Sequence, residues 1–288
     1  LLLLLDHLNS RHPFRTCDAL GRYFFDHLSV EAADIETDQP RLLNGLAGFR
    51  FFGTTMRSLR FELTPRAQAQ HGLPSCFAHI GFKGLHPSGF DTMRSALRAW
   101  QQSGSVDVKQ FASIARDLPY LTEAAYWRIV HGQLLWPAPA RYGLHVVTEQ
   151  LPQASNRITL ARSCDMYDCP RAAIQWNIGA AERSALRAHT RLFDAFWQLT
   201  TASEFSRLRW ITDDMSEEKE CRRLSDIFHP GGTTRMGNDG VSSVVNADLA
   251  THAIPNLFVA ATSVFPSGGS ANPTLTLAAL ALRLADHV

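Results

Sequence analysis

Residues 229–237 read HPGGTTRMG, and residues 267–276 read SGGSANPTLT. The first stretch places His229 beside paired glycines and then adds the fixed positive charge of Arg235, and the second places Asn272 shortly after another glycine pair. Glycine has no side chain, so such turns let backbone approach a ligand closely. His229 and Asn272 are 43 positions apart (272 − 229), and they are predicted to lie at the edges of one site where a flat ligand rests against backbone.

Asn272 and Pro273 predict the start of a helix, because asparagine suits the N-cap position and proline suits the first helical position. The helix is expected to run from Thr274 to His287 and to be buried, since apolar residues surround much of its circumference. A helix N-terminus carries roughly half a positive charge, which stabilises an anion placed before it. Asn272 therefore has two compatible roles, as a plain cap and as a ligand contact.

A second part of the site is expected just before these turns. Residues 256–260 read NLFVA and predict a short apolar strand, and the small residues Ala261, Thr262 and Ser263 follow it. In α/β sheets, ligands bind at the C-terminal ends of strands. The small residues leave room for a ligand there.

The bulk composition describes a soluble globular protein. Of the 288 residues, 45% are hydrophobic and 19% are charged, and the formal net charge is +1. This balance gives no reason to expect nucleic acid or an acidic surface as a partner. No apolar run reaches membrane-spanning length, and any targeting signal is expected upstream of Leu1.

The five cysteines do not indicate a disulfide framework, because their number is odd and the chain is not small. Cys164 and Cys169 flank two aspartates, which makes a metal site one alternative. Zinc sites normally need a second ligand pair at short spacing, and none is visible near these residues. Partly buried free thiols and no metal ligands are the expectation.

Hydrophobic patterns predict a mixed α/β (α+β) fold. Residues 1–5 are all leucine and are expected to form a buried strand that is entered in mid-domain. Residues 91–135 are expected to be mainly helical, and residues 180–199 predict the clearest helix, with one apolar and one charged face. The strands expected to pair antiparallel are at residues 143–150, 156–161 and 172–176.

These motifs closely resemble the C-terminal signature of the glucose-methanol-choline (GMC) oxidoreductases, which are FAD enzymes that oxidise alcohols. The resemblance is strongest from His229 onward, and it is moderate at residues 21–27 (GRYFFDH), 149–152 and 156–160. Residues 36–140 match only in general character. The resemblance implies the C-terminal portion of a two-domain FAD enzyme: a remnant of the FAD-binding α/β domain plus an antiparallel-sheet substrate domain covered by helices.

The resemblance also implies a division of the chain. Residues 1–35 are expected to be the incomplete end of the FAD-binding domain, and residues 36–225 the substrate-binding domain. Residues 226–288 are expected to return to the FAD-binding domain and to carry the active-site motifs.

In the family, the histidine that begins the H-x-x-G-T motif is the catalytic base, which here is His229. The second active-site residue is a histidine or asparagine before the last helix, which here is Asn272. The implied mechanism passes hydride from the carbinol carbon to flavin N5 while His229 accepts the hydroxyl proton and Asn272 orients the oxygen. By position, the cofactor contacts are Ala261, Thr262, Pro273 and Thr274.

The sequence also departs from the family. It lacks the G-x-G-x-x-G fingerprint that grips the FAD pyrophosphate, and Asn246 and Ala253 replace the usual aspartate and glycine. We therefore expect a fragment that binds FAD weakly or not at all by itself. Its expected partner is an N-terminal FAD-binding half, in the same or a separate chain, and alone it should expose the surface that meets this half.

The predicted function is an FAD-dependent oxidoreductase acting on the CH–OH group of an alcohol, sugar or polyol, as a dehydrogenase or an oxidase. The alternative is a non-catalytic remnant or substrate-binding module that has lost the flavin. The absent fingerprint favours this alternative, and the intact pair of His229 and Asn272 opposes it. Flavin content separates the two hypotheses.

Overall fold

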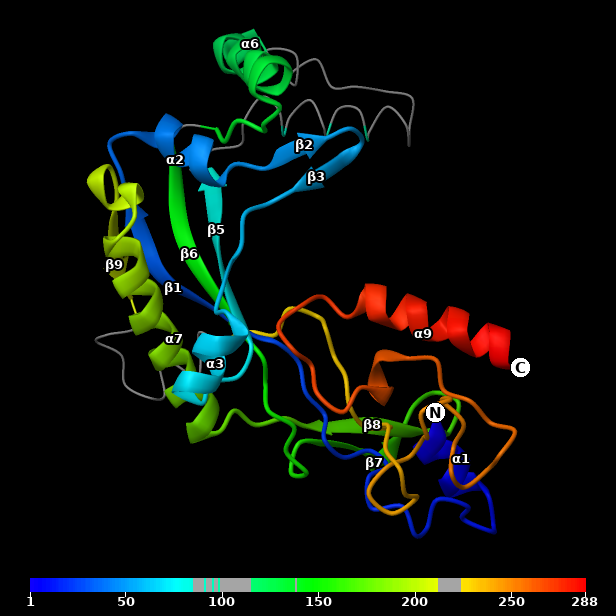
Figure 1. Cartoon of the computed structure of the whole chain (residues 1–288). Helices are drawn as coiled ribbons and strands as arrows, with labels where there is room; N and C mark the ends of the chain where they lie inside the picture. Colours follow the sequence, from blue (N-terminus) through cyan, green and yellow to red (C-terminus); the bar gives the residue numbers. More distant parts are fainter. Residues whose placement is uncertain (85–90, 92–94, 96–97, 99–114, 138, 212–223) are drawn as a thin grey trace.

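The computed structural model describes residues 1–84, 91, 95, 98, 115–137, 139–211 and 224–288. Its main feature is an antiparallel five-stranded sheet with the order β4-β5-β6-β1-β9. Figure 1 shows helix α7 along one side of this sheet and, below it, a second region that contains both termini.

The strands of the sheet are β1 (Leu28–Glu36), β4 (Phe61–Glu62), β5 (Cys76–Gly84), β6 (Ala140–Thr148) and β9 (Arg207–Trp210). The other strands are β2 (Arg50–Phe52), β3 (Thr55–Arg57), β7 (Arg157–Cys164) and β8 (Pro170–Gln175). The α-helices are α1 (Leu2–Leu8), α2 (Pro40–Ala47), α3 (Pro65–His71), α6 (Leu118–Tyr126), α7 (Ala180–Gln198) and α9 (Thr274–His287). There are also a short π-helix, η1 (Trp127–His131), and two short 3-10 helices, η2 (Thr201–Glu204) and η3 (Thr262–Val264).

The five-stranded sheet is apolar on one face and polar on the other, because successive side chains of a strand point to opposite faces. Ala78 and Leu144 lie on the apolar face and are buried in the same core as α7. On the polar face, His79 is paired with His145, and His145 with Glu31, across β5, β6 and β1. Burial, together with the neighbouring His145, lowers the pKa of His79 to about 4, so this ring is neutral at physiological pH.

Helix α7 closes the apolar face of the sheet, and the helix predicted at residues 180–199 is thereby confirmed. Leu186 and Trp197 are almost fully buried. The ring of Phe61 on β4 packs edge-on against Phe193 and Trp197, with centroid distances of 5.3 and 6.3 Å. Such edge-to-face pairs add to the hydrophobic gain of burying the rings.

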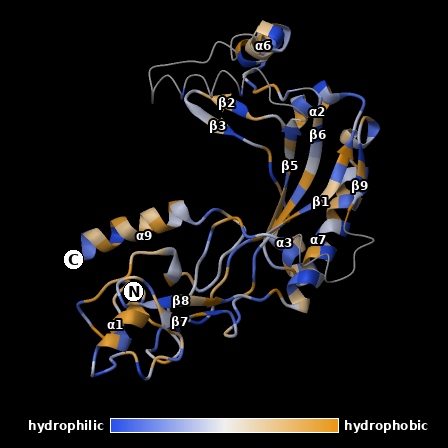
Figure 2. Cartoon of the chain, turned by 180° about the vertical axis from the view of Figure 1, so that it is seen from behind, coloured by the Kyte–Doolittle hydropathy of each residue, from blue (hydrophilic) through white to orange (hydrophobic). Residues whose placement is uncertain are grey.

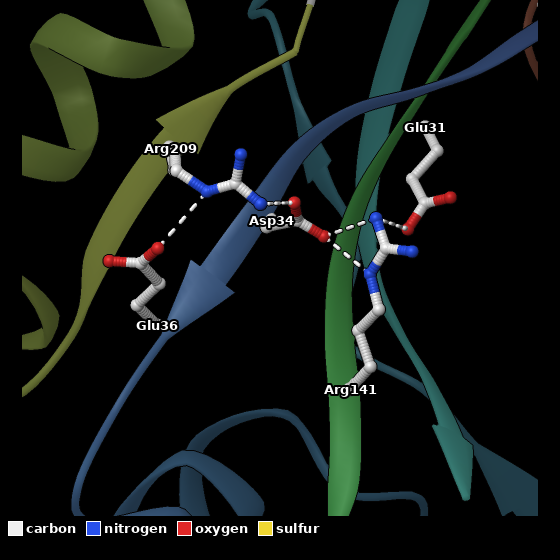
Figure 3. A network of polar contacts seen from close by, with 5 residues as sticks. All are labelled: Glu31, Asp34, Glu36, Arg141 and Arg209. Atoms are coloured by element: carbon white, nitrogen blue, oxygen red, sulfur yellow. Dashed lines mark hydrogen bonds and ion pairs between the residues drawn. The ribbon is translucent and has the colours of Figure 1, made fainter. Parts of the chain in front are cut away.

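A buried carboxylate ties three strands of the sheet together (Figure 3). Asp34 on β1 is bound by Arg141 of β6 at 2.5 Å and by Arg209 of β9. Glu31 and Glu36 lie 3.7 and 3.0 Å from the same two guanidinium groups. Both arginines are more than half exposed, so each pair contributes little Coulomb energy. The network mainly satisfies Asp34, which would otherwise be an unpaired buried charge.

The terminal region, defined as residues 1–27 and 226–288, has a separate and smaller core. Phe14, near the N-terminus, packs in one cluster with Val245, Leu249 and Val264 from the other end of the chain. Figure 1 shows the N-terminal helix surrounded by these C-terminal segments.

Helix α9 runs from Thr274 to His287, so it begins one residue after the first helical position predicted at Pro273, and it is not buried. Leu280 and Leu284 contact the terminal core, whereas Leu275 and Leu282 are 82% and 70% exposed. Figure 2 shows apolar colour along this helix, which extends on the outside of the molecule. The expected burial is therefore wrong for this chain alone, since the described residues cover one side of a helix that is apolar nearly all round. No helix among the described residues, α9 included, is long and apolar enough to cross a membrane.

The three strands expected in the middle of the chain are confirmed as β6, β7 and β8, and they are antiparallel to their partners. However, β7 and β8 form a hairpin of their own and do not join the sheet of β6. Of the region expected to be helical, residues 91–135, α6 and η1 are helical, and most of residues 91–114 lie outside the described part of the chain.

Two predicted strands are wrong. Residues 1–5 belong almost entirely to helix α1, in which Leu2 alone is buried, and this one-sided contact is what a surface helix makes. Residues 256–260 form a single bridge, between Phe258 and Ala250, because this segment crosses the terminal core without a continuous partner strand.

The expected domain boundary between residues 35 and 36 falls inside β1. This strand pairs with β6 and β9 and forms part of the sheet, although its first residue follows directly on the terminal region. The division of the chain into domains therefore stays a proposal.

Candidate active site

The loop that carries His229 lies against the backbone of residues 22–25. Phe25 and Gly231 exchange two backbone hydrogen bonds, of 3.2 and 2.9 Å. Gly232 has a φ of 75°, and a Cβ there would overlap the carbonyl oxygen of Tyr23. Glycine is therefore required at this position both for conformation and for space. In the structure, the close approach at Gly232 is between two backbone segments of the chain.

The ring of Phe25 joins this loop to the second glycine-rich stretch. A Cβ on Gly231 would overlap the ring, and a Cβ on Gly268 would come within 2.9 Å of it. Phe25 is almost fully buried. The two stretches that begin at residues 229 and 267 therefore both contact the ring of Phe25, at neighbouring ring atoms.

His27 is the polar link between the same two stretches. Its Nδ1 lies 3.2 Å from Nδ1 of His229, and its Nε2 lies 3.5 Å from the carbonyl oxygen of Gly268. The two imidazoles meet edge to face, with centroids 5.1 Å apart. His27 is 1% exposed, and this burial lowers the pKa of His27 below its ordinary value, so the buried ring is neutral.

Asp26 fixes the backbone of both histidines. Its Oδ1 accepts hydrogen bonds from the backbone N–H of His229 at 3.0 Å and of His27 at 2.6 Å. Burial raises the pKa of Asp26, and these backbone hydrogen bonds oppose the rise because they favour the ionised carboxylate. One carboxylate oxygen thus fixes the backbone of both histidines, in addition to the contact between their rings.

The loop at residues 267–270 is anchored to the end of the sheet. Glu149 Oε1 accepts a hydrogen bond of 3.0 Å from the backbone N–H of Gly269, and the hydroxyls of Ser75 and Ser270 are 2.6 Å apart. These contacts place Gly268 against His27 independently of α9.

The residue before the histidine is strained. Phe228 has a φ of 61°, a conformation that bulky side chains rarely adopt, and it is 84% exposed. Such strain persists only where the surroundings impose it, and it is frequent at functional sites. Here the hydrogen bonds made by His229 and Gly231, which follow Phe228 in the chain, hold the loop in place.

Two of the predicted cofactor contacts lie beside the His229 loop. Ala261 and Thr262 are partly buried. The carbonyl oxygen of Thr262 would be 3.2 Å from a Cβ on Gly231, which is tight packing. His229, Ala261 and Thr262 therefore come from adjoining loops.

The other predicted residues lie at the start of α9. Asn272 is exposed, and its side chain makes no hydrogen bond within the described residues. Pro273 occupies the N-cap position and Thr274 is the first helical residue, so the cap expected at Asn272 is displaced by one residue. No hydrogen bond among the described residues joins Asn272 to His229. His27 contacts both His229 and the carbonyl oxygen of Gly268, which lies four residues before Asn272.

The sequence assigns no site role to Asp26 or His27, although both belong to the segment GRYFFDH, residues 21–27. The adjacent pair of Asp26 and His27 is nevertheless a sequence signal for a polar site. Two adjacent ionisable residues directly before an apolar strand, which begins at Leu28, are costly to bury unless they have partners.

Cys164 and Cys169 lie at the β7–β8 hairpin, and Cys164 is exposed. Among the residues that the structure describes, which do not include Cys221, no three histidine, cysteine, aspartate or glutamate side chains are grouped to hold a metal ion. A mainly apolar cavity of about 440 Å³ lies between α7, α3 and β5, and none of the predicted site residues borders it.

Comparisons with known proteins agree with the motifs. Residues 152–281 match the family described as GMC oxidoreductase. The fructose dehydrogenase large subunit of Gluconobacter japonicus is 31% identical over 245 residues, which are 76% of this chain and 42% of that protein. Paromamine 6'-oxidase of Streptomyces fradiae is 43% identical over 137 residues, 48% of this chain and 23% of that protein.

Among solved structures, pyridoxine 4-oxidase from Mesorbium loti matches 94% of this chain and 44% of its own, with a TM-score of 0.50 and 15% identity, which shows a shared fold. The chain thus spans less than half the length of the proteins it matches. Together with the family match over the His229 and Asn272 motifs, these relatives show that the chain belongs to the GMC oxidoreductases and corresponds to their C-terminal part.

Proposed function

We propose that this chain supplies the substrate-side groups of an FAD-dependent oxidoreductase that oxidises the CH–OH group of an alcohol, sugar or polyol. The observation that carries the proposal is the placement of His229, whose Nδ1 and backbone N–H are held by His27 and Asp26 while its Nε2 makes no hydrogen bond within the described residues. A partly buried imidazole with one free nitrogen is suited to general base catalysis. The names of two relatives give fructose and paromamine as substrates, which supports a sugar-like substrate.

The residues present fit a flavin. Helix α9 begins without a side-chain cap, so the N–H groups of its first turn remain available to an anionic ring edge. We assign the cofactor contacts to Ala261, Thr262, Pro273 and Thr274. The chemistry that FAD supplies when bound is acceptance of a hydride.

His229 accepts the hydroxyl proton of the substrate at Nε2, and Asn272 donates a hydrogen bond from its amide to the same oxygen. The substrate loses one proton and one hydride and becomes a carbonyl compound. Proton transfer by a positioned side chain contributes typically about 10²- to 10⁴-fold in rate.

The terminal core supports a domain division in which residues 1–27 and 226–288 belong with an N-terminal FAD-binding half, and the five-stranded sheet belongs to the substrate domain. The expected division at residue 35 is moved to the start of β1 in this proposal, because β1 is paired within the sheet.

The test uses the protein together with its FAD-binding half and follows anaerobic bleaching of the flavin by fructose, other sugars, polyols and primary alcohols. We expect His229→Ala to slow flavin reduction by about 100-fold or more while bound FAD is retained. The matched control is His71→Ala, which removes an exposed histidine at the end of α3. Unchanged reduction by the His229→Ala protein would exclude His229 as the base, and absence of FAD in the wild type would favour the non-catalytic alternative.

A further inference from the structure

The contacts of His27 determine where its proton lies. A carbonyl oxygen can only accept a hydrogen bond, so the contact with Gly268 places the proton of a neutral His27 on Nε2. Its Nδ1 then carries a lone pair. The opposite tautomer would direct the Nε2 lone pair at the Gly268 oxygen inside a buried site, which is unfavourable.

The proton of His229 follows from that of His27. The two Nδ1 atoms are 3.2 Å apart, and one of them must donate. Because Nδ1 of His27 is the acceptor, Nδ1 of His229 carries the proton. The Nε2 of a neutral His229 is then the unprotonated nitrogen.

We propose that His27 is a positioning residue, which holds His229 in the tautomer whose Nε2 can accept the substrate proton. The inference rests on the proposed function of His229 as the base. It goes beyond that function because it assigns a role to a residue outside the matched segment, residues 152–281.

The same arrangement tolerates the proton once it is taken. An imidazolium at His229 still donates from Nδ1 to His27, so the pair does not have to reorganise. Asp26 and Glu149 are the charged groups that face His27 from the adjoining segments, and their negative charges oppose the fall in the pKa of His27. The Gly268 carbonyl, four residues before Asn272, links this pair to the loop that precedes α9.

Three variants of His27 test separately its acceptor, Nδ1, and its donor, Nε2–H. In His27→Asn, the amide oxygen lies near the former Nδ1 and can accept from His229. In His27→Gln, the longer amide reaches toward Gly268 but leaves no acceptor at His229, and His27→Phe removes both groups. The control is His189→Phe, which removes another buried histidine that contacts a backbone carbonyl, that of Pro74 at 3.1 Å.

The experiment measures anaerobic flavin reduction by the sugar or alcohol that the wild type oxidises fastest, at several pH values, in the protein with its FAD-binding half. We expect the limiting rate of flavin reduction to fall about 10- to 100-fold in His27→Phe and His27→Gln, with the apparent Kd of the substrate changed less than about twofold, because second-sphere partners of a functional histidine have effects of that size. We expect His27→Asn to recover most of the rate and the wild-type pH profile, and His189→Phe to match the wild type.

A readout independent of turnover is the nitrogen NMR spectrum of His229, which reports which ring nitrogen carries the proton. We expect the Nδ1–H form in the wild type and in His27→Asn, and a mixture of tautomers in His27→Phe. Wild-type rates and an unchanged spectrum in His27→Phe would overturn the inference, as would equal losses in the Asn and Phe variants. If His229→Ala itself reduces flavin normally, the proposed function fails instead.

Discussion

The five-stranded sheet with α2 and α7, called the sheet region from here on, and helix α9 of the terminal region differ in how far their apolar residues are covered. In the sheet region, α2 and α7 pack on the apolar face, and Trp136, Leu144 and Trp197 are almost inaccessible. In the terminal region, the core is built of smaller groups, and α9 leaves Leu275 and Leu282 largely exposed. A core that is fully covered indicates a unit that folds by itself, whereas an exposed apolar helix indicates a surface that contacts another protein surface. The difference supports the proposal that the terminal region completes its fold against an FAD-binding half.

The largest expected effect is in the sheet region. Trp197→Ala removes a buried ring that packs against Phe61 and Phe193, and we expect it to lower the free energy of unfolding by about 3–5 kcal/mol. Urea denaturation followed by circular dichroism measures the loss. Leu199→Ala, next to the end of α7 but 88% exposed, is the control and should change stability by less than about 0.5 kcal/mol.

Hydrogen exchange then tests whether the two regions are separate. In Trp197→Ala we expect protection to fall in β1, β5 and β6 and to persist in the terminal core. Equal loss in both regions would show that they unfold as one unit and would remove the basis of the comparison.

A smaller effect is expected from Gly232→Ala in the terminal region. The alanine would have to adopt a φ of 75°, and its Cβ would overlap the Tyr23 backbone. We therefore expect the free energy of unfolding to fall by about 2 kcal/mol or more. Gly53→Ala is the matched control, because Gly53 also has a positive φ, of 59°, but has no atom close to the added Cβ. It should lose only the conformational part, about 1 kcal/mol. Equal losses in urea denaturation would show that the contact with Tyr23 is unimportant.

The smallest effect on stability is expected on α9. The double variant with Leu275→Ser and Leu282→Ser should change the free energy of unfolding of this chain by less than about 0.5 kcal/mol, since both side chains are exposed. It should nevertheless reduce concentration-dependent association in sedimentation velocity, because it removes apolar surface. A clear loss of stability without any change in association would indicate that α9 is packed within the chain rather than against a partner.

Local elements could be predicted from the sequence because their signals are local. The bounds of α7 follow from its apolar stripe, and those of α9 follow from Asn272-Pro273 and the leucines after it. The strand predicted at residues 1–5 is wrong because a run of leucines has neither the period of a strand nor that of a helix.

The arrangement of the sheet and the centre of the site could not be predicted in this way. Strand β1 lies between β6 and β9, whose partner residues are more than a hundred positions away, and no local pattern specifies that register. His27 likewise acquires its role only when the loops of His229 and Gly268 fold against it. The sequence predicts the loops that carry the proposed site, but not His27, the residue that contacts both loops.

The contact of Phe25 with Gly231 and Gly268 also restricts the order in which these positions can change during evolution. A side chain added at either glycine would meet the ring while Phe25 is present. Replacement of Phe25 by a smaller residue must therefore precede any substitution at Gly231 or Gly268, and the reverse order passes through a disrupted loop. Lineages that keep the phenylalanine are expected to keep both glycines, so the three positions should be inherited as a set.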